Sequence, residues 1–167
     1  MTTAEEAQAE LGSLMGRLAR ESGAYVAHGR LRPEDGGLAA RGSSLVSEIY
    51  TLVYQAHEEW ARQDSYVQMP ASHVEIEAGL VALARHEAAA TMARFASECP
   101  LWNVTLMDSS RALRHTSRVV QILGPDAQWW SNHDDLSSDS FTGCTVDSLV
   151  AGTDGTVFAV LLQSFSD

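Results

Sequence analysis

The sequence predicts an α+β fold in which about four helices pack on both faces of a small, mainly antiparallel sheet. Two observations lead to this prediction. Apolar residues recur at helical spacing through much of the chain before residue 124, and a β-hairpin pattern ends the chain. Both faces of that hairpin are apolar, so both need a cover, and helices are the only elements available to provide it. The predicted architecture is a three-layer α/β/α arrangement.

A capping box marks the start of the first helix. Thr3 and Glu6 have the spacing at which each side chain bonds the backbone N–H of the other residue. The helix is predicted over residues 4–21, and Gly23 can close it in the left-handed conformation. The segment 28–42 contains Pro and several Gly residues and predicts a loop or linker. We therefore expect an N-terminal helix with its linker, residues 1–42, which can form an arm, and one globular α+β domain, residues 43–167.

The same reasoning predicts three further helices, over residues 44–63, 72–98 and 109–123. It also predicts one short strand, over residues 102–107. The third helix begins at a second capping box, Ser72 with Glu75, and ends before Pro100. Asp108 or Ser109 caps the fourth helix, which ends at a Gly-Pro stop signal.

The clearest local pattern lies at the C-terminus. Segments 143–153 and 156–165 flank Asp154-Gly155, a pair that favours a type I′ turn because both residues tolerate positive φ. Counting outward from the turn places Leu149, Phe158, Val160 and Leu162 on one face of the hairpin, and Val146, Val150, Val157, Leu161 and Phe165 on the other.

The charge is strongly negative and unevenly distributed. The formal net charge is −11, and residues 119–167 carry seven aspartates and no lysine or arginine. A field of this sign repels nucleic acid and anionic membranes and attracts basic partners, so we expect neither nucleic acid nor membrane as a ligand. All 11 basic residues are arginine, which suggests a GC-rich bacterial source. We find no signal peptide or membrane-spanning segment and expect a cytoplasmic location.

Some aspartates of this C-terminal third have structural explanations. Asp154 belongs to the predicted turn, Asp167 is the terminus, and Asp147 falls on a strand face, either at an edge or buried. The remaining four aspartates lie close in the sequence to a tryptophan pair and to His133. Together with the two tryptophans they form the predicted binding patch: Asp126, Trp129, Trp130, Asp134, Asp135 and Asp139. Such a group can line a small-molecule pocket. Alternatively, the tryptophans anchor a surface loop and the aspartates solvate it.

Three residues are candidates for acid–base chemistry: His57, Glu87 and His133. Glu87 projects into the apolar stripe of the predicted third helix, where burial would raise its pKa, as a general acid or base requires. Alternatively, the face becomes polar there, and Glu87 lies in an exposed, salt-bridged strip with Arg94 and Glu98. His57 lies at the edge of the apolar stripe of the second helix, where a histidine can also be purely structural.

Other side chains give weaker indications. His73 and Glu77 have an i, i+4 spacing that helical metal sites use, but Glu75 and Glu77 also complement the helix dipole, and we expect no metal or cofactor. Cys99 and Cys144 have no Cys-x-x-Cys spacing and predict two buried thiols. Three arginines of the predicted fourth helix either bind a phosphate or carboxylate or pair with acids of the chain or of a partner subunit: Arg111, Arg114 and Arg118.

The stretch from Trp130 to Phe165 resembles part of a known family. His133, the tripeptide Phe141-Thr142-Gly143 and the run 154–158 are similar to the end of the CAP superfamily of cysteine-rich secretory and pathogenesis-related proteins. The resemblance implies an α/β/α sandwich with a His/Glu cleft. It covers about a fifth of the chain, and the family's Gly-Glu-Asn motif is absent, so no site residue is carried over.

Taken from the sequence, the expected function is that of an acidic interaction or inhibitor protein whose C-terminal anionic patch docks on a basic partner. The alternative is a small bacterial biosynthetic enzyme, with a small molecule bound in a pocket lined by Trp129, Trp130 and His133, and with Glu87 or His57 as acid or base. Homo-oligomerisation through the first helix is a further expectation.

Overall fold

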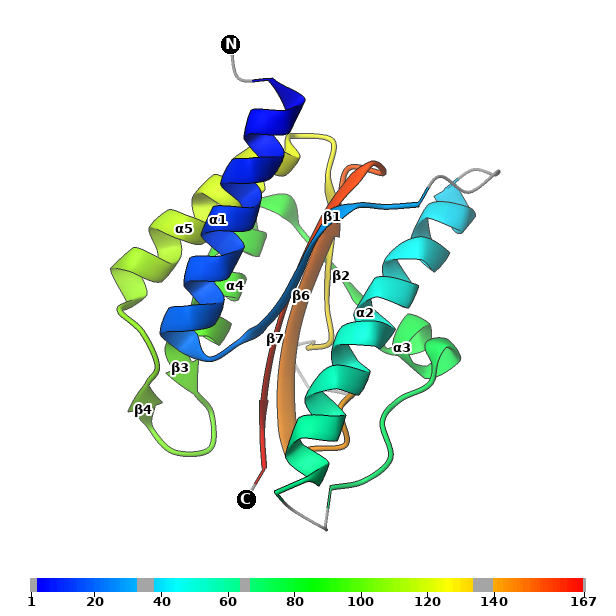
Figure 1. Cartoon of the computed structure of the whole chain (residues 1–167), viewed down its shortest axis with the longest axis vertical. Helices are drawn as coiled ribbons and strands as arrows, with labels where there is room; N and C mark the ends of the chain where they lie inside the picture. The colour runs from blue at the N-terminus through cyan, green and yellow to red at the C-terminus, as the bar shows by residue number, and fades with distance from the viewer. Residues whose placement is uncertain (1–2, 33–37, 64–66, 134–139, 167) are drawn as a thin grey trace.

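A five-stranded antiparallel sheet forms the middle layer of the molecule (Figure 1). The computed structural model describes residues 3–32, 38–63, 67–133 and 140–166, without the side chains of residues 38–43. The strand order is β1-β7-β6-β5-β2, where the strands span Tyr25–Arg30 (β1), Val81–Leu83 (β2), Gln128–Ser131 (β5), Val146–Thr153 (β6) and Val157–Phe165 (β7).

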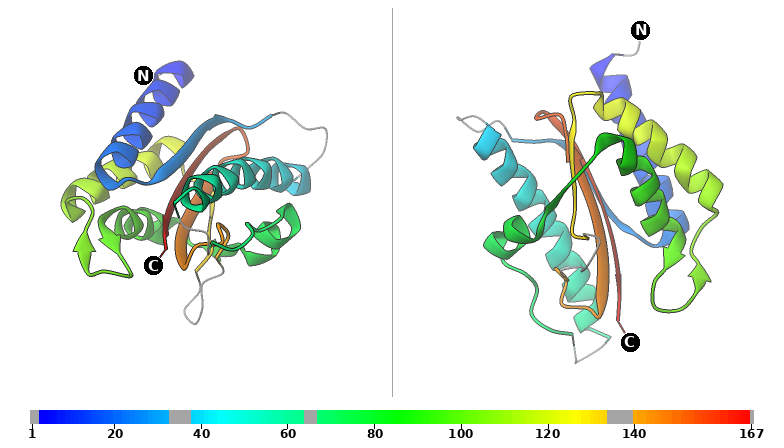
Figure 2. Two further views of the ribbon diagram at one scale, coloured as in Figure 1. Left: turned by 60° about the horizontal axis from the view of Figure 1, so that its bottom comes forward. Right: turned by 180° about the vertical axis from the view of Figure 1, so that it is seen from behind.

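Helices cover both faces of this sheet, so the predicted α+β fold is confirmed. One face carries α1 (Ala4–Ser22), α4 (Arg85–Ser97) and α5 (Ser109–Leu123), and the opposite face carries α2 (Leu38–Ala61) and α3 (His73–Gly79). Figure 2 shows the three layers from two further directions. The structure describes five helices where about four were predicted.

Each face of the hairpin packs into its own apolar core. The core under α1, α4 and α5 contains Leu11, Met15, Leu18, Met92, Phe95, Val119, Trp129, Val150 and Leu161. The core under α2 and α3 contains Ile49, Val53, Ile76, Phe141, Leu149, Phe158, Val160 and Leu162. The predicted division of hairpin residues between two buried faces is therefore confirmed, because strand alternation alone determines it.

The predicted β-hairpin is present, but its turn differs from the prediction. A type I′ turn needs positive φ at both central residues, yet among the described residues only glycines have positive φ, Gly155 with φ 97° included. Asp154 instead accepts hydrogen bonds at Oδ1 from the backbone N–H groups of Thr156 and Val157, both at 2.8 Å. The carboxylate thus closes a longer loop between the paired residues Thr153 and Phe158.

The N-terminal helix packs into the main body. Both hydrogen bonds of the Thr3/Glu6 capping box form, and Gly23 ends the helix with φ 78°. The segment 28–42 is not one continuous loop, because β1 extends to Arg30 and α2 begins at Leu38. β1 pairs with β7 along its whole length, since the outer side of β7 has no other partner.

The predicted third helix is two helices with a strand between them. The Ser72/Glu75 capping box forms, but α3 ends at Gly79, and β2 pairs with Trp129–Ser131 of β5 before α4 begins. The outer edge of β5 takes these three residues as its partner strand, and this pairing overrides the local helical periodicity.

The strand predicted over residues 102–107 is largely absent. Only Val104–Thr105 (β4) pairs, and it does so with Glu98–Cys99 (β3) in a separate two-stranded sheet outside the central layer. Trp102 and Val104 are about half exposed, although the Trp102 ring lies edge-on to Phe165 at the end of β7, with 6.0 Å between ring centroids.

Candidate functional site

Asp147 is a buried carboxylate at the start of β6, with 1% of its surface exposed. Its Oδ2 accepts hydrogen bonds from the backbone N–H groups of Phe141 and Thr142 and from the hydroxyls of Ser140 and Thr142, at 2.7–3.1 Å, and its Oδ1 accepts one from Nδ2 of Asn132 at 2.7 Å. Burial raises the pKa of this carboxyl above its ordinary value, and the bonds from Thr142, Ser140 and Phe141 counteract part of the rise. Of the two positions predicted for Asp147, the buried one is correct.

This network fixes the proton of His133. Its Nε2 lies 3.0 Å from the backbone oxygen of Asp147 and 3.1 Å from the hydroxyl of Ser148. Because a carbonyl oxygen only accepts, Nε2 must carry a hydrogen, and Nδ1 holds the free electron pair of the neutral ring. No described residue donates a hydrogen bond to Nδ1. The ring packs against Phe95, with 5.1 Å between ring centroids.

His133 and Glu87 line the same cleft, which lies between α4 and the β2 edge of the sheet and has a volume of about 600 Å³. We call it the α4 cleft; its other lining residues include His86, Thr91, Arg94 and Ser131. Its lining includes one acid, Glu87, two histidines and one arginine, so the cleft can hold a small molecule with a carboxylate and move a proton on it.

Glu87 is exposed, with 59% of its side chain open to solvent, so the desolvated carboxylate considered from the sequence does not exist there. The exposed strip is the correct alternative. Its ion pairs differ from those expected, because the described partner of Glu87 is His86, 3.9 Å away, rather than Arg94 or Glu98. The Arg94 guanidinium lies over the Phe95 ring, 5.2 Å from its centroid.

His57 lies away from this cleft, on the side of the sheet covered by α2. Its Nδ1 donates to the backbone oxygen of Thr142 at 2.9 Å, because that oxygen can only accept. His133 and Glu87 therefore share one cleft. His57 instead contacts Thr142, a residue of the Asp147 network, from the helical layer on the other side of the sheet.

The two tryptophans point to opposite faces of β5. Trp129 has 2% of its surface exposed and packs in the α1/α4/α5 core, while Trp130 is half-buried against the α2/α3 core. Neither lines the α4 cleft. Asp126 is exposed just before β5, and the remaining residues of the predicted binding patch lie outside the described residues: Asp134, Asp135 and Asp139.

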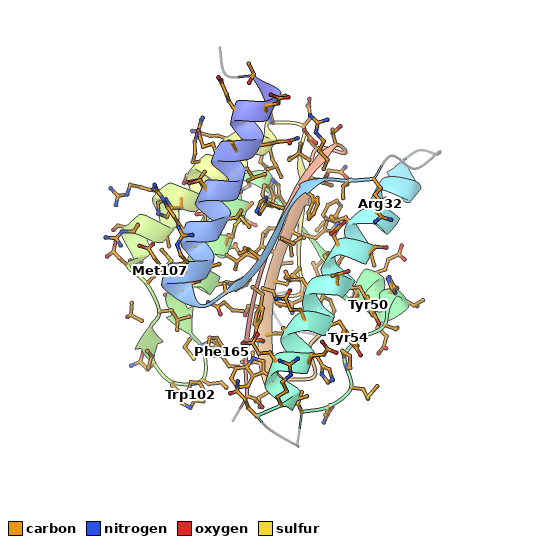
Figure 3. All side chains as sticks on the ribbon, viewed as in Figure 1. Arg32, Tyr50, Tyr54, Trp102, Met107 and Phe165 are labelled. Carbon is orange, nitrogen blue, oxygen red and sulfur yellow. The ribbon has the colours of Figure 1, made fainter. Side chains whose placement is uncertain are left out.

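A row of aromatic rings crosses the outer side of α2 and reaches α3. Tyr50 stacks on His73, with 4.1 Å between ring centroids, and Tyr54 follows at 6.1 Å from Tyr50 and 6.2 Å from His57. Figure 3 shows both tyrosines on the same side of α2. Tyr54 is 43% exposed, and Val74, next to His73, is 76% exposed. We call these five residues the aromatic face.

Acidic residues surround the aromatic face. Glu58 follows Tyr54 by one helical turn, and Glu77 follows His73 by one turn, so each shares a side of its helix with that ring. Both are exposed, whereas Glu59 is held to β1 by the Tyr25 hydroxyl at 2.8 Å. Residues 44–84 contain six acids and one arginine.

Sequence reasoning did not single out the aromatic face. Tyr50 and Tyr54 border the apolar stripe of α2 at i, i+4 spacing, and this spacing is the signal that indicates a shared exposed ridge. The contribution of His73 could not be found in this way, because the stacking depends on how α3 docks on α2.

Arginines of α5 pair within the chain, as one of the two alternatives predicted. Arg111 bonds Glu21 of α1 at 2.7 Å, and Arg118 bonds Glu10 at 2.6 Å in a bidentate pair. These bonds hold α5 to α1 on the outer side of their layer.

Cys99 and Cys144 are both buried and are not joined in a disulfide, so the predicted pair of buried thiols is confirmed. Within the described part of the chain, no group of three or more His, Cys, Asp or Glu side chains is placed to hold a metal ion. None of the described helices is both long enough and apolar enough to cross a bilayer.

Comparisons with family models, with curated proteins and with solved structures found no match to this chain. The resemblance of the C-terminal stretch to the CAP superfamily stays a prediction.

Proposed function

We propose that this protein docks on a basic surface of a partner protein through the aromatic face. The observation that carries the proposal is the row of rings from His57 to His73, in which Tyr54, Tyr50 and His73 are stacked and Tyr54 and His73 are exposed. Exposed apolar surface rimmed by polar groups is typical of protein interfaces, and tyrosine is enriched among the residues that dominate binding energy. The rings are already held in place by stacking, so little side-chain entropy is lost on binding.

The chemistry of the surroundings selects the partner. Glu58 and Glu77 bring negative charge next to Tyr54 and His73, and tyrosine rings bind guanidinium groups by cation–π contact. A surface that presents arginines can therefore stack on Tyr54 and pair with Glu58 at once. This proposal keeps the basic partner expected from the sequence and moves the docking surface from the C-terminal patch to α2 and α3.

A photo-crosslinking amino acid tests the location. Placed at Tyr54, it should form a crosslink to a basic partner in cells of the source organism, whereas the same amino acid at Gln121, exposed on α5, should not. Mass spectrometry identifies the crosslinked protein and the residues joined. A crosslink to a second copy of this chain, or to an acidic surface, would contradict the proposal.

The purified partner then gives the quantitative test. Tyr54→Ala and Glu58→Arg should each weaken the dissociation constant by about tenfold or more, as expected for an aromatic anchor and a paired charge. Asp126→Arg is the matched control, because Asp126 is an exposed acid of the C-terminal patch. If Asp126→Arg weakens binding and Glu58→Arg does not, the C-terminal patch is the docking surface and our proposal is wrong.

The α4 cleft favours a second candidate function, acid–base chemistry on a small carboxylate. The specific observation is the Nε2–H tautomer of His133, which leaves Nδ1 able to accept a proton in a residue that lines the same cleft as Glu87 and Arg94. Arg94 would bind the carboxylate, and His133 would accept the proton.

Fragment screening by amide chemical shifts tests this candidate. Carboxylate fragments should shift the amides of residues 86–94 and 131–133, and Arg94→Gln should weaken their binding by roughly tenfold. Arg85→Gln is the matched control, because Arg85 lies on α4 and bonds the backbone oxygen of Gly124 instead of lining the cleft. If no carboxylate fragment shifts these amides, the cleft is not a binding site for that class.

A further inference from the structure

Positively charged side chains gather where the end of α1 meets the start of α5. Six residues line a groove of about 570 Å³ there: Arg17, Arg20, Glu21, Arg111, Arg114 and His115. We call it the arginine groove. α1 and α5 lie side by side in Figure 1, and each contributes two arginines. The groove is on the opposite side of the sheet from the aromatic face.

Acids of the chain neutralise only part of this charge. Glu21 pairs with Arg111 at 2.7 Å and lies 3.9 Å from His115, and it is the only carboxylate among the lining residues. In the part of the chain that the structure describes, the guanidinium groups of Arg17, Arg20 and Arg114 make no ion pair. Four arginines therefore face one glutamate, in a chain whose formal net charge is −11.

His115 reports the field inside the groove. Partial burial is the largest cause that lowers the pKa of His115 below the ordinary value; Glu21 raises this pKa, and the charges of Arg17, Arg114 and Arg111 lower it. Three arginine charges therefore act on the position of His115, and the same charges attract an anion that enters the groove.

The chemistry of the groove points to phosphate. Guanidinium groups bind phosphate oxygens with two parallel hydrogen bonds each, and several of them can share a chain of linked phosphates. The size of the ligand follows from the rest of the molecule, because the negative charge elsewhere repels an extended polyanion but acts little on an anion confined to the groove.

We propose that the arginine groove binds a small phosphate compound with two or more linked phosphate groups. The ligand lies across α1 and α5, with Arg17 and Arg20 on one side and Arg111 and Arg114 on the other. Arg111 is already oriented by Glu21, and the other three arginines are free to turn toward the ligand. This site is independent of the docking surface on α2 and α3.

Calorimetric titration with inorganic tripolyphosphate at low ionic strength tests the proposal. Arg17→Gln and Arg114→Gln should each weaken its dissociation constant by about tenfold, because a charge-assisted contact is lost. Neither substitution breaks a described ion pair, so the melting temperature should not change. Arg30→Gln, at an exposed arginine of β1, is the control for net charge and should change binding by less than about twofold.

Three results would overturn the proposal. The first is no binding of tripolyphosphate to the unmodified protein, and the second is a loss of affinity in Arg30→Gln equal to that in Arg114→Gln. The third is binding of a ten-nucleotide single-stranded DNA as tight as that of tripolyphosphate, which would assign the groove to nucleic acid. Amide shifts confined to residues 17–21 and 111–115 on addition of tripolyphosphate would support it.

Discussion

Asp147 holds the segment 140–144 against the start of β6, because its two carboxylate oxygens accept five hydrogen bonds. Strand alternation placed this residue on a hairpin face but left its burial open. The donors that surround it come from a loop and from Asn132 beyond β5, and no periodicity in the sequence connects them. Single polar residues in a core are therefore the least predictable part of this chain.

Replacement of Asp147 measures the contribution of this network. Asp147→Ala leaves five donors without their acceptor in a buried site and should lower the free energy of unfolding by about 3 kcal/mol or more. Asp147→Asn should have a smaller effect, because its oxygen can replace Oδ2 while its amide faces the Asn132 amide, another donor. Urea unfolding of the three proteins gives these differences.

The matched control is Asp154→Ala in the hairpin loop. Asp154 also accepts two backbone hydrogen bonds, but it is exposed, so water can replace it and the expected loss is about 1 kcal/mol. Equal losses for Asp147→Ala and Asp154→Ala would mean that burial of the Asp147 network adds nothing to stability.

Among the elements, those with their own start and stop signals were predictable. The capping boxes of α1 and α3, the Asp108 cap of α5 and the apolar hairpin all appear where the sequence indicates. The three elements α3, β2 and α4 were predicted as one helix, because their apolar residues keep a helical spacing. Only the pairing of β2 with β5 explains the interruption, and pairing between distant segments leaves no local signal.

The packing of β5 on β6 depends on one glycine. Gly152 lies opposite Trp129, and a Cβ atom at that position would overlap the indole ring. Gly152→Ala should therefore lower the free energy of unfolding by about 1–3 kcal/mol, as overpacking does in other cores. In a Trp129→Leu background the same substitution should cost much less, and a double-mutant cycle with thermal unfolding measures the difference.

Gly16→Ala provides the control for glycine substitution. Gly16 lies inside α1, where an added methyl group meets only the mobile end of Arg20. Alanine favours the helix more than glycine, so this variant should be more stable by up to about 1 kcal/mol. If Gly152→Ala is as destabilising in the Trp129→Leu background as in the unmodified protein, the close approach of the ring is not the cause.

For the whole molecule, the three-layer order was predictable from one argument, that a hairpin apolar on both sides must be covered on both sides. The candidate sites were less predictable from the sequence. His133 and Glu87 line one cleft, but the two tryptophans and His57 expected with them do not. The aromatic face and the arginine groove each depend on how two helices dock, and no local pattern in the sequence describes that docking.

The two helical layers differ in charge. Helices α1, α4 and α5 carry seven arginines and five glutamates, whereas α2 and α3 carry one arginine and five glutamates. The layers lie on opposite sides of the sheet, so the positive and negative surfaces cannot neutralise each other by contact within one molecule (Figure 2).

The charges of the helices are thereby separated along the direction perpendicular to the sheet. If the proposed basic partner exists, this separation favours an approach in which α2 and α3 arrive first and the arginine groove faces outward. The two proposed sites lie on opposite sides of the sheet, so a phosphate compound in the arginine groove would not block a protein partner on the aromatic face. If both proposals hold, the chain would join a small anion to a basic surface.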